Sequence, residues 1–398
     1  MPTSHASLGP SASARWLTCT ASVGLIEEVF PDGVDTGGVY AQEGTWAHSA
    51  AELAAAESLG LVTNKRTHQA RWRRWKKAVP EDLHEEMIDH ARSYADELAE
   101  IRDGMPGTPI ALLEQVVHTS SPEVWGTADC ILASDEEIVV VDYKYGRGVS
   151  VSPEGNSQLS LYGVGAIHEL ENLLTDFRDE CLVTLVVYQP RAPHGGGAWT
   201  TSVGDLRRFE TERVIPAVEQ IRAGDTRYAP SEAACRWCPA AGMCSAQTEW
   251  ATRRDFAPTG AMGPGQIAEA LSELGGIEDW CRKVREQALR ITYEEGQVIP
   301  GWKSVLTPGR RSIADHAKAI ETLDAAGYPP DQTSRANTET ITKLSKLVGG
   351  TDALNDLLGD LIKTSSGKHT LVPEDDPRPA ATAASGAESD FRDPVPED

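Results

Sequence analysis

The segment Gly126–Lys144 reads GTADCILASDEEIVVVDYK and decides the fold. Two apolar runs flank the polar residues Ser134–Glu137, which have the length of a hairpin loop. If the residues next to this loop pair with each other, the register places Asp129 opposite Asp142 on neighbouring antiparallel strands. The segment therefore predicts a β-hairpin whose two strands carry facing carboxylates.

These facing carboxylates need a compensating positive charge, because cross-strand neighbours have Cβ atoms about 5 Å apart and like charges there repel. Lys144 lies two residues beyond Asp142 and therefore on the same face of its strand. Two carboxylates and an ammonium group at one end of a sheet form a site for a divalent cation, and oxygen ligands suit Mg²⁺ and Mn²⁺. The alternative is that both aspartates end strands near solvent and that Lys144 only pairs with one of them.

Four further polar residues favour the cation site. Glu114 falls on the preceding predicted strand and supplies a third carboxylate, and His48 falls on a predicted helix. Gln158 and Tyr162 are four residues apart in another predicted helix and so share one of its faces. Each of these residues alone is more often an ordinary surface or core residue.

Helical and strand patterns alternate around the hairpin over residues 1–255. Apolar residues at spacings of three and four predict helices, and β-branched runs bounded by turn residues predict strands. The predicted helices are 43–59, 81–102, 154–170 and 205–223, and the predicted strands are 110–118, 127–133, 138–144 and 182–189. This succession is typical of an α/β fold.

The pattern changes after residue 255. Proline and glycine residues between 258 and 265 mark a boundary. Helical patterns at 266–292, 314–326 and 339–358 predict a mostly helical region over residues 256–372. Residues 373–398 contain eight acidic residues and almost no large apolar ones, so they cannot offset the entropy of ordering. We expect this tail to be disordered.

The formal net charge of −23 is unusual for a nucleic-acid-binding protein, because phosphate contacts are normally made by Lys and Arg. One segment is the exception: residues 65–77 contain seven cationic residues interleaved with two tryptophans. We expect this segment to contact DNA, with Arg71, Arg73 and Arg74 as binding residues. The alternative is a solvated helix face whose tryptophans dock on the body of the protein.

The cysteines predict a second metal site. Cys235, Cys238 and Cys244 form a C-x2-C-x5-C run, which has the spacing of metal ligands and needs a fourth thiolate. Cys19 lies in a loop-like setting and is the predicted fourth ligand. The other cysteines fall in or beside predicted strands and helices, where packed thiols are expected; they are Cys130, Cys181 and Cys281.

Apolar stretches, the first residues and the cysteine count together indicate in which compartment the protein acts. No stretch approaches about 18 consecutive apolar residues, and the first residues lack a basic segment followed by an apolar one. Seven cysteines in 398 residues are too few for a disulfide scaffold, and the odd count favours reduced thiols. We expect a cytoplasmic protein without a membrane contact.

The order of these polar residues over about residues 1–250 resembles the motif series of RecB-like nucleases in the PD-(D/E)XK superfamily. The matching residues are His48, Glu114, Gly126-x-x-Asp129, Asp142-x-Lys144 and Gln158-x-x-x-Tyr162. No proline precedes Asp129, but the Gly-x-x-Asp form is common among RecB-like members.

This resemblance implies a PD-(D/E)XK core, in which a central mixed sheet is flanked by helices. It implies that His48, Asp129 and Asp142 hold Mg²⁺ or Mn²⁺ and that Lys144 positions or activates the attacking water. Glu114 is the least secure of the implied catalytic residues. The Gln158–Tyr162 pair is implied to contact the DNA strand.

The cysteine pattern resembles the iron–sulfur subgroup of the same nucleases. The resemblance implies a 4Fe–4S cluster on Cys19, Cys235, Cys238 and Cys244 that staples the ends of the nuclease region together. The alternative is Zn²⁺ on the same four cysteines, since spacing does not separate the two metals. The whole chain also resembles an uncharacterised phage-encoded family, whose genes often accompany single-strand annealing proteins; the implied partners are DNA and such a protein.

These observations predict a metal-dependent DNA nuclease, an exonuclease or end-processing enzyme in phage recombination or replication. One alternative is a catalytically silent DNA-binding scaffold that retains the fold and the cluster. The complete set of Asp129, Asp142 and Lys144 argues against it. A redox or electron-transfer protein is a third possibility, and it leaves the carboxylates unexplained.

Overall fold

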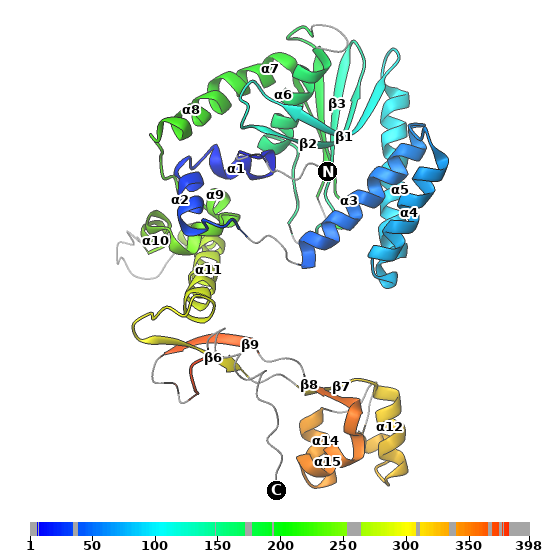
Figure 1. The fold of residues 1–398 in the computed structure, drawn as a ribbon, viewed down its shortest axis with the longest axis vertical. Helices are drawn as coiled ribbons and strands as arrows, with labels where there is room; N and C mark the ends of the chain where they lie inside the picture. Colours follow the sequence, from blue (N-terminus) through cyan, green and yellow to red (C-terminus); the bar gives the residue numbers. More distant parts are fainter. Residues whose placement is uncertain are drawn as a thin grey trace. The chain divides into compact units, whose positions relative to one another are not determined.

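The computed structural model describes residues 6, 8–34, 39–147, 149–171, 177–192, 195–252, 264–307, 311–333, 340–364, 368–373, 376 and 378–381. The chain divides into two compact units, Met1–Trp280 and Cys281–Asp398 (Figure 1). The predicted boundary at 255/256 lies outside the described residues. So does the predicted disordered tail, 373–398, apart from a few positions.

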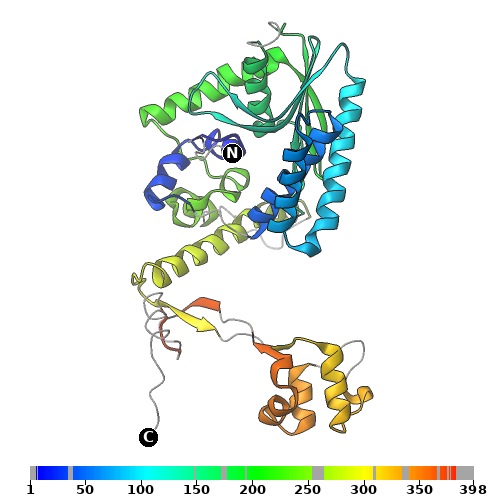
Figure 2. The ribbon, with the colours of Figure 1, turned by 45° about the vertical axis from the view of Figure 1, so that its right-hand side comes forward.

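A five-stranded mixed sheet forms the centre of the first unit, as Figures 1 and 2 show. In spatial order its strands are β1 (Ile110–His118), β2 (Trp125–Ala133), β3 (Glu137–Tyr143), β4 (Leu182–Tyr188) and β5 (Gly197–Ser202). β3 and β4 are parallel, and the other neighbours are antiparallel. The first four strands are predicted from the sequence, whereas the short β5 carries too few apolar residues to be recognised.

The register of the β2–β3 hairpin is the predicted one. Ala133 pairs with Ile138, and the pairing continues to Cys130 and Val141. Asp129 and Asp142 occupy the next position, at the end of the ladder. The sheet therefore presents both aspartates at the same edge.

Helices cover both faces of this sheet, and each face has its own core. On one face α3 (Val39–Ser58), α4 (Lys65–Ala78) and α5 (His84–Gly104) pack against Cys130, Leu132, Val139 and Val141. On the other face α6 (Ser157–Glu171) and α7 (Val203–Phe209) pack against Ile131, Ala133, Ile138 and Val140. The alternation of apolar side chains along the strands makes this two-sided burial possible.

The predicted helices begin at other residues than expected, as three in the first unit illustrate. α3 begins four residues earlier than predicted, at Val39, and α5 begins at His84 after the 3-10 turn η2 (Glu81–Leu83). α6 begins at Ser157 instead of residue 154, because the side chain of Asn156 accepts a hydrogen bond from the Leu159 N–H at 3.2 Å and caps the helix. Periodicity locates a helix but does not reveal where its capping bonds form.

Short elements close the first unit around its cysteines. They are η1 (Pro10–Ala12), α1 (Ser13–Trp16), α2 (Ala21–Val29), the π-helix η3 (Glu210–Val214), α8 (Ile215–Ala223), α9 (Glu232–Arg236), η4 (Pro239–Met243) and α10 (Ser245–Thr252). Trp16, which is fully buried, packs with residues of α8 in a third core cluster. Most of these elements are too short to show a period, and only the region of α7 and α8 is predicted from the sequence.

The second unit contains helices and four short strands. Its described elements are the end of α11 (Pro264–Tyr293), β6 (Trp302–Thr307), β7 (Arg311–Ile313), α12 (His316–Ala325), α13 (Pro330–Thr333), α14 (Ile341–Val348), α15 (Thr351–Leu358), η5 (Gly359–Leu361), β8 (Ile362–Thr364) and β9 (Lys368–Pro373). The strands, which are not predicted, pair as β6–β9 and β7–β8. Among the described helices of the whole chain, none has the length and apolar character needed to cross a membrane.

Candidate metal and cysteine sites

The sheet aligns three carboxylates across three neighbouring strands. The β1–β2 register runs through Leu113 paired with Cys130 and Gln115 paired with Ala128, so Glu114 stands opposite Asp129. Asp129 in turn stands opposite Asp142. Glu114 thus joins the predicted pair, in the position expected for a third carboxylate.

The alternation of faces is interrupted at this row. In a regular strand, side chains an odd number of positions apart point to opposite faces of the sheet. Leu112 and Val117 nevertheless pack into the same core cluster, and so do Ala128 and Ile131. Glu114 has a φ of 48°, a left-handed conformation that is rare for residues other than glycine. This irregularity allows side chains from α3 and α6, which cover opposite faces of the sheet, to approach the same row of carboxylates.

The first of these groups is His48, from α3. Its Nδ1 lies 3.2 Å from Asp129 Oδ1, and its ring contacts Tyr143 edge-on. Ligand atoms of His48, Glu114 and Asp129 all lie within 4.8 Å of one another, which is close enough to share one metal ion. The other oxygen of Asp129 accepts the Tyr143 N–H at 2.7 Å, which fixes the carboxylate.

The second group surrounds Asp142, which is 3% exposed, and consists of Lys144, just after β3, and of Gln158 and Tyr162 from α6. Lys144 Nζ donates to both carboxylate oxygens of Asp142, at 3.0 and 3.1 Å, and to Gln158 Oε1 at 3.2 Å. Gln158 Nε2 lies 3.2 Å from Asp142 Oδ1 and 3.2 Å from Tyr162 Oη. Asp142, Lys144, Gln158 and Tyr162 therefore form one hydrogen-bonded network beside the His48 group.

The arrangement differs in detail from the predicted ligand set. The family resemblance implies His48, Asp129 and Asp142 as ligands, whereas the structure brings His48 and Asp129 together with Glu114 and pairs Asp142 with Lys144. Tyr162 is 7% exposed, and both it and Gln158 bond within the site. The predicted contact of this pair with a DNA strand stays a prediction.

Burial and crowding change the acidity of these groups. Burial, reinforced by Asp129, raises the pKa of Glu114 to about 7. Burial also raises the pKa of Asp142 to about 6, although Lys144 opposes it. Burial acts in the same direction on Asp129, but His48, the Tyr143 N–H and Lys144 outweigh it and lower the pKa of Asp129. The pKa values of Glu114 and Asp142 are raised because burial and neighbouring carboxylates disfavour their negative charge. A bound cation would offset this repulsion, so such carboxyl groups are typical of a cation site.

Gly126 has a steric role in this site. A Cβ atom on Gly126 would lie 2.8 Å from Pro10 Cγ and 3.1 Å from Tyr162 Cε1, closer than ordinary contact. Glycine therefore lets the N-terminal segment and Tyr162 pack directly against β2. The close packing of Pro10 and Tyr162 therefore requires a glycine at position 126, the first residue of the Gly-x-x-Asp motif.

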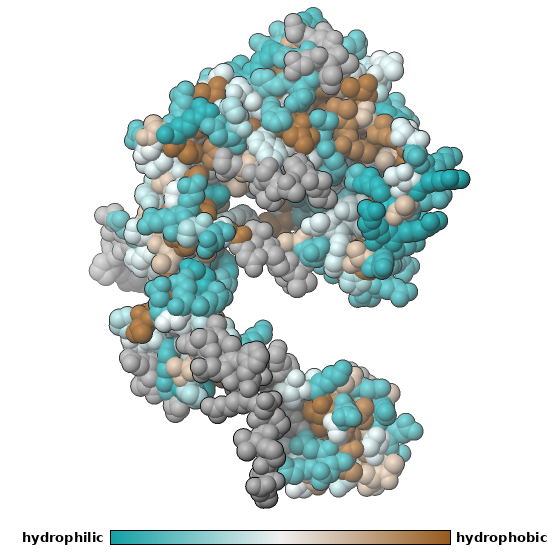
Figure 3. Space-filling view, in the orientation of Figure 1, coloured by the Kyte–Doolittle hydropathy of each residue, from teal (hydrophilic) through white to brown (hydrophobic). Residues whose placement is uncertain are grey.

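Helix α4 combines the two interpretations of the basic segment. Trp75 is 5% exposed, and its Nε1 donates to the Trp46 carbonyl at 2.7 Å. The half-buried Trp72 packs against the same core, so both tryptophans dock on the body as the alternative predicts. All seven cationic residues of the helix are exposed. Arg71 pairs with Glu52 at 2.5 Å, whereas Arg73 and Arg74 have no ion pair within the described residues. The surface over α4 is hydrophilic (Figure 3).

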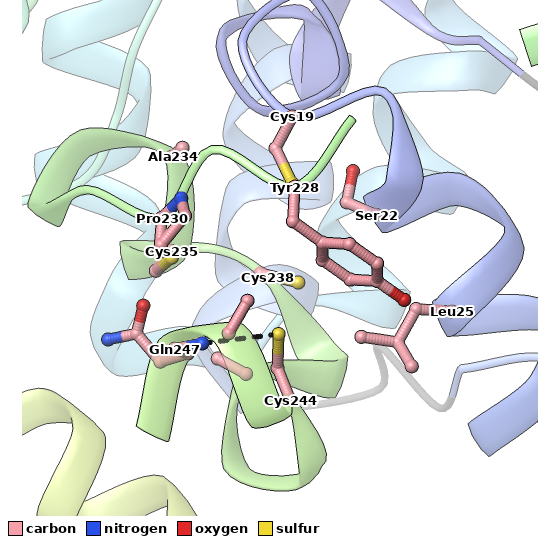
Figure 4. A pocket seen from close by; sticks show the side chains of 12 residues that line it. Cys19, Ser22, Leu25, Tyr228, Pro230, Ala234, Cys235, Cys238, Cys244 and Gln247 are labelled. Carbon is pink, nitrogen blue, oxygen red and sulfur yellow. Dashed lines mark hydrogen bonds between the residues drawn. The ribbon is translucent and has the colours of Figure 1, made fainter. Parts of the chain in front are cut away.

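The four predicted cysteines line a single small pocket (Figure 4). Cys19, Cys238 and Cys244 are buried, and Cys235 is half-buried. The Ala229 N–H donates to Cys19 Sγ at 3.5 Å and the Gln247 N–H to Cys244 Sγ at 3.4 Å. Burial and the neighbouring thiols raise the pKa of Cys235 to about 11. The four side chains thus line one pocket, and two of their sulfur atoms accept backbone hydrogen bonds, as thiolate ligands do. No three of these sulfur atoms, all of which the structure describes, lie within 4.8 Å of one another, the spacing that ligands of a single ion need.

The remaining three cysteines lie away from this pocket. Cys130 is in β2, Cys181 precedes β4 and Cys281 is in α11, as the sequence indicates. Cys19, in contrast, lines the same pocket as Cys235, Cys238 and Cys244, and its role as the fourth ligand stays a prediction.

Comparison with known proteins places the chain in a family without an assigned activity. Residues 5–379 match a family model described as protein of unknown function (DUF2800). The chain belongs to the DUF2800 family. A solved structure titled "Crystal structure of SSO0001" is similar at 12% identity, covers 50% of this chain and 85% of that chain, and has a TM-score of 0.23. A likeness of this size carries no argument about fold or function.

Two features of this DUF2800 member are not predicted from its sequence. Arg15 lies beside the cysteine pocket, where its interaction with Cys238 and Cys19 opposes the lowering of its pKa by burial. Arg15 is four residues before Cys19, and this spacing could have indicated a cation beside the cysteine site. Ser13 meets Ser157 across 144 positions of sequence, and nothing in the local pattern indicates that contact.

Proposed function

We propose that this protein is a metal-dependent DNA nuclease with a RecB-like core of the PD-(D/E)XK type. The observation that supports the proposal most is the convergence of two groups at one edge of the sheet: His48, Glu114 and Asp129 on one side, and Asp142 with Lys144 on the other. Oxygen and imidazole ligands beside a half-buried ammonium group suit hydrolysis of a phosphodiester.

In this mechanism each residue has a separate task. His48, Glu114 and Asp129 would hold Mg²⁺ or Mn²⁺, with Asp142 adjacent. When bound, the cation neutralises charge on the phosphate and lowers the pKa of water. Lys144, held by Asp142 and Gln158, orients the attacking water and stabilises the negative charge that develops on it. Tyr143 keeps Asp129 in place through its backbone N–H.

The four cysteines would hold a 4Fe–4S cluster, with Zn²⁺ as the alternative occupant. Either centre joins Cys19 to Cys235 across more than 200 residues. Closing a loop of this length restricts the unfolded chain and stabilises the folded one. The proposed role of the centre is structural.

The substrate and setting follow from charge and from the family resemblance. The exposed cations of α4 supply a surface for DNA phosphates in an otherwise acidic chain. We propose an exonuclease or end-processing enzyme of phage recombination or replication, acting in the cytoplasm of a bacterial host beside a single-strand annealing protein. The competing function is a silent DNA-binding scaffold, which the intact carboxylate–lysine network disfavours.

Cleavage by an Asp142→Ala variant separates these two functions. Anaerobically purified protein is incubated with end-labelled linear and circular DNA, with and without Mn²⁺. We expect the parent to degrade linear DNA only with the cation and Asp142→Ala to lose at least about a hundredfold of the rate, since the variant frees Lys144 from its partner. Asp135→Ala, in the exposed loop of the same hairpin, serves as the control and should cleave normally. Cleavage by Asp142→Ala at the parental rate would show that the assignment is wrong, and a parent without activity would favour the scaffold.

A further inference from the structure

One N-terminal segment, residues 8–19, contacts both the carboxylate site and the cysteine pocket. It consists of η1 and α1 and ends at Cys19. Hydrogen bonds within it hold it together: Trp16 Nε1 donates to the Gly9 carbonyl at 3.1 Å, and the Cys19 N–H donates to the Arg15 carbonyl at 2.8 Å. Because Trp16 is fully buried, the segment is anchored between its two ends.

Two residues of this segment pack against the elements that carry the carboxylate site. Pro10 packs where a Cβ atom of Gly126 would be, against the strand that carries Asp129. The hydroxyl oxygens of Ser13 and Ser157 are hydrogen-bonded at 2.7 Å, and Ser13 is 1% exposed. Ser157 is the first residue of α6, and the next residue is Gln158, which binds Asp142 and Lys144.

The other end of the segment is part of the cysteine pocket. Cys19 supplies one of the four sulfur atoms, and Arg15 Nη1 donates to Ser22 Oγ at 3.0 Å on the wall of the same pocket. α1 also contacts α9, which carries Cys235. The position of α1 therefore depends on how the four thiols are held.

We propose that Ser13 is a positioning residue that couples the two centres, a proposal that rests on the proposed function. With the cysteine centre loaded, α1 is fixed, Ser13 holds Ser157 in the first turn of α6, and Gln158 holds Asp142 and Lys144. Loss of the cysteine-bound metal releases α1 and loosens this network. Ser13 acts on the carboxylate site through Ser157, Gln158 and Asp142, which lies beside the proposed ligands. The cation affinity of that site therefore follows the state of the cysteine centre.

Mn²⁺ binding to the full chain, without DNA, tests the role of Ser13. The free Mn²⁺ signal in electron paramagnetic resonance is titrated for anaerobically purified parent, Ser13→Ala and Ser160→Ala. Ser160 is a matched control, because it is a buried serine of α6 whose hydroxyl bonds only to the Asn156 carbonyl within the described residues. We expect Ser13→Ala to bind Mn²⁺ about tenfold more weakly, with parental content of cysteine-bound metal and a parental melting temperature, and Ser160→Ala to match the parent. Parental Mn²⁺ affinity in Ser13→Ala would overturn the proposal.

Removal of the cysteine-bound metal tests the coupling itself. The metal is stripped with a chelator, the chelator is removed, and far-UV circular dichroism checks that the chain stays folded. Removing the cysteine-bound metal should weaken Mn²⁺ binding in the parent but should weaken it little further in Ser13→Ala, where the coupling is already lost. An equal loss of Mn²⁺ affinity in both proteins would overturn coupling through Ser13. If the stripped chain unfolds, the comparison of loaded Ser13→Ala with Ser160→Ala decides.

An Asp129→Asn variant distinguishes failure of this coupling from failure of the proposed function. If parent and Asp129→Asn bind Mn²⁺ equally, the carboxylate site is not the cation site and both proposals fall. If Asp129→Asn loses binding while Ser13→Ala keeps it, the cation site stands and only the coupling is wrong.

Discussion

At the scale of single residues, Gly126 gives the sharpest steric prediction. A methyl group at this position overlaps Pro10 and the Tyr162 ring. In Gly126→Ala we expect Tyr162 to move and Gln158 with it, so that cleavage falls by about tenfold and the free energy of unfolding by roughly 1–3 kcal/mol. Cleavage rates and denaturant unfolding measure the two effects.

The control for this prediction is Gly104→Ala. A Cβ atom there has no neighbour within 4 Å, and alanine is the better helix former at the end of α5. This variant should cleave normally and be at least as stable as the parent. Equal behaviour of the two variants would contradict the steric role of Gly126.

The register of the hairpin could be predicted residue by residue, because loop length and side-chain alternation fix it. Asp129, Asp142 and Lys144 lie where that register puts them. The sequence and the family resemblance place Glu114 and His48 at the site, but they do not predict that Glu114, instead of Asp142, groups with His48 and Asp129. That grouping depends on the left-handed backbone of Glu114. Periodicity describes regular strands and carries no signal for such an irregularity.

At the scale of elements, α4 predicts a difference between arginines that share one helix. Arg73 and Arg74 are exposed, whereas Arg71 pairs with Glu52. Replacing Arg73 and Arg74 with alanine should reduce the slope of log affinity for DNA against log salt by about 0.7–0.9 for each lost phosphate contact. Arg71→Ala should change the slope less. Fluorescence anisotropy with labelled DNA over a range of salt concentrations gives the slopes.

Unchanged slopes in the double variant would leave α4 as a solvated helix face docked through Trp75. The helix itself could be predicted from its composition, and Asn64 caps it by accepting the Thr67 N–H at 3.1 Å. Short elements such as α1 and α9 could not be predicted, because one or two turns show no period and tertiary contacts hold them. α1, for example, is fixed by buried Trp16 and by the Ser13–Ser157 bond.

At the scale of the whole molecule, the cysteines organise residues that are distant in sequence. The spacing of Cys235, Cys238 and Cys244, together with the loop-like setting of Cys19, suffices to select the four cysteines that line one pocket, because the other three fall in or beside predicted strands and helices. The four strands of Cys281–Asp398 were not predicted, since each has at most six residues and pairs with a strand far along the chain. The sequence thus predicts the centre of the first unit better than the second unit.

Removal of Cys19 tests whether one centre joins the two ends of the first unit. Cys19→Ala should lose most of its iron and unfold at a lower temperature, because the loop between Cys19 and Cys235 is no longer closed in the unfolded chain. A crosslink over a loop of this length is worth roughly 4–5 kcal/mol in the chain-entropy account. Iron and sulfide analysis, an absorbance spectrum of oxygen-free protein and thermal unfolding provide the measurements.

Cys181→Ala is the matched control, since Cys181 is half-buried beside β4 and outside the pocket. It should keep the parental iron content and a melting temperature near that of the parent. A measurement of one zinc ion per chain would identify Zn²⁺ as the bound metal instead of the cluster, and the four cysteines would still join the two ends of the first unit. Undiminished iron in Cys19→Ala would mean instead that Cys235, Cys238 and Cys244 bind it without Cys19. The joining of the two ends would then rest on packing and on hydrogen bonds such as that from the Arg227 N–H to Thr20 Oγ1.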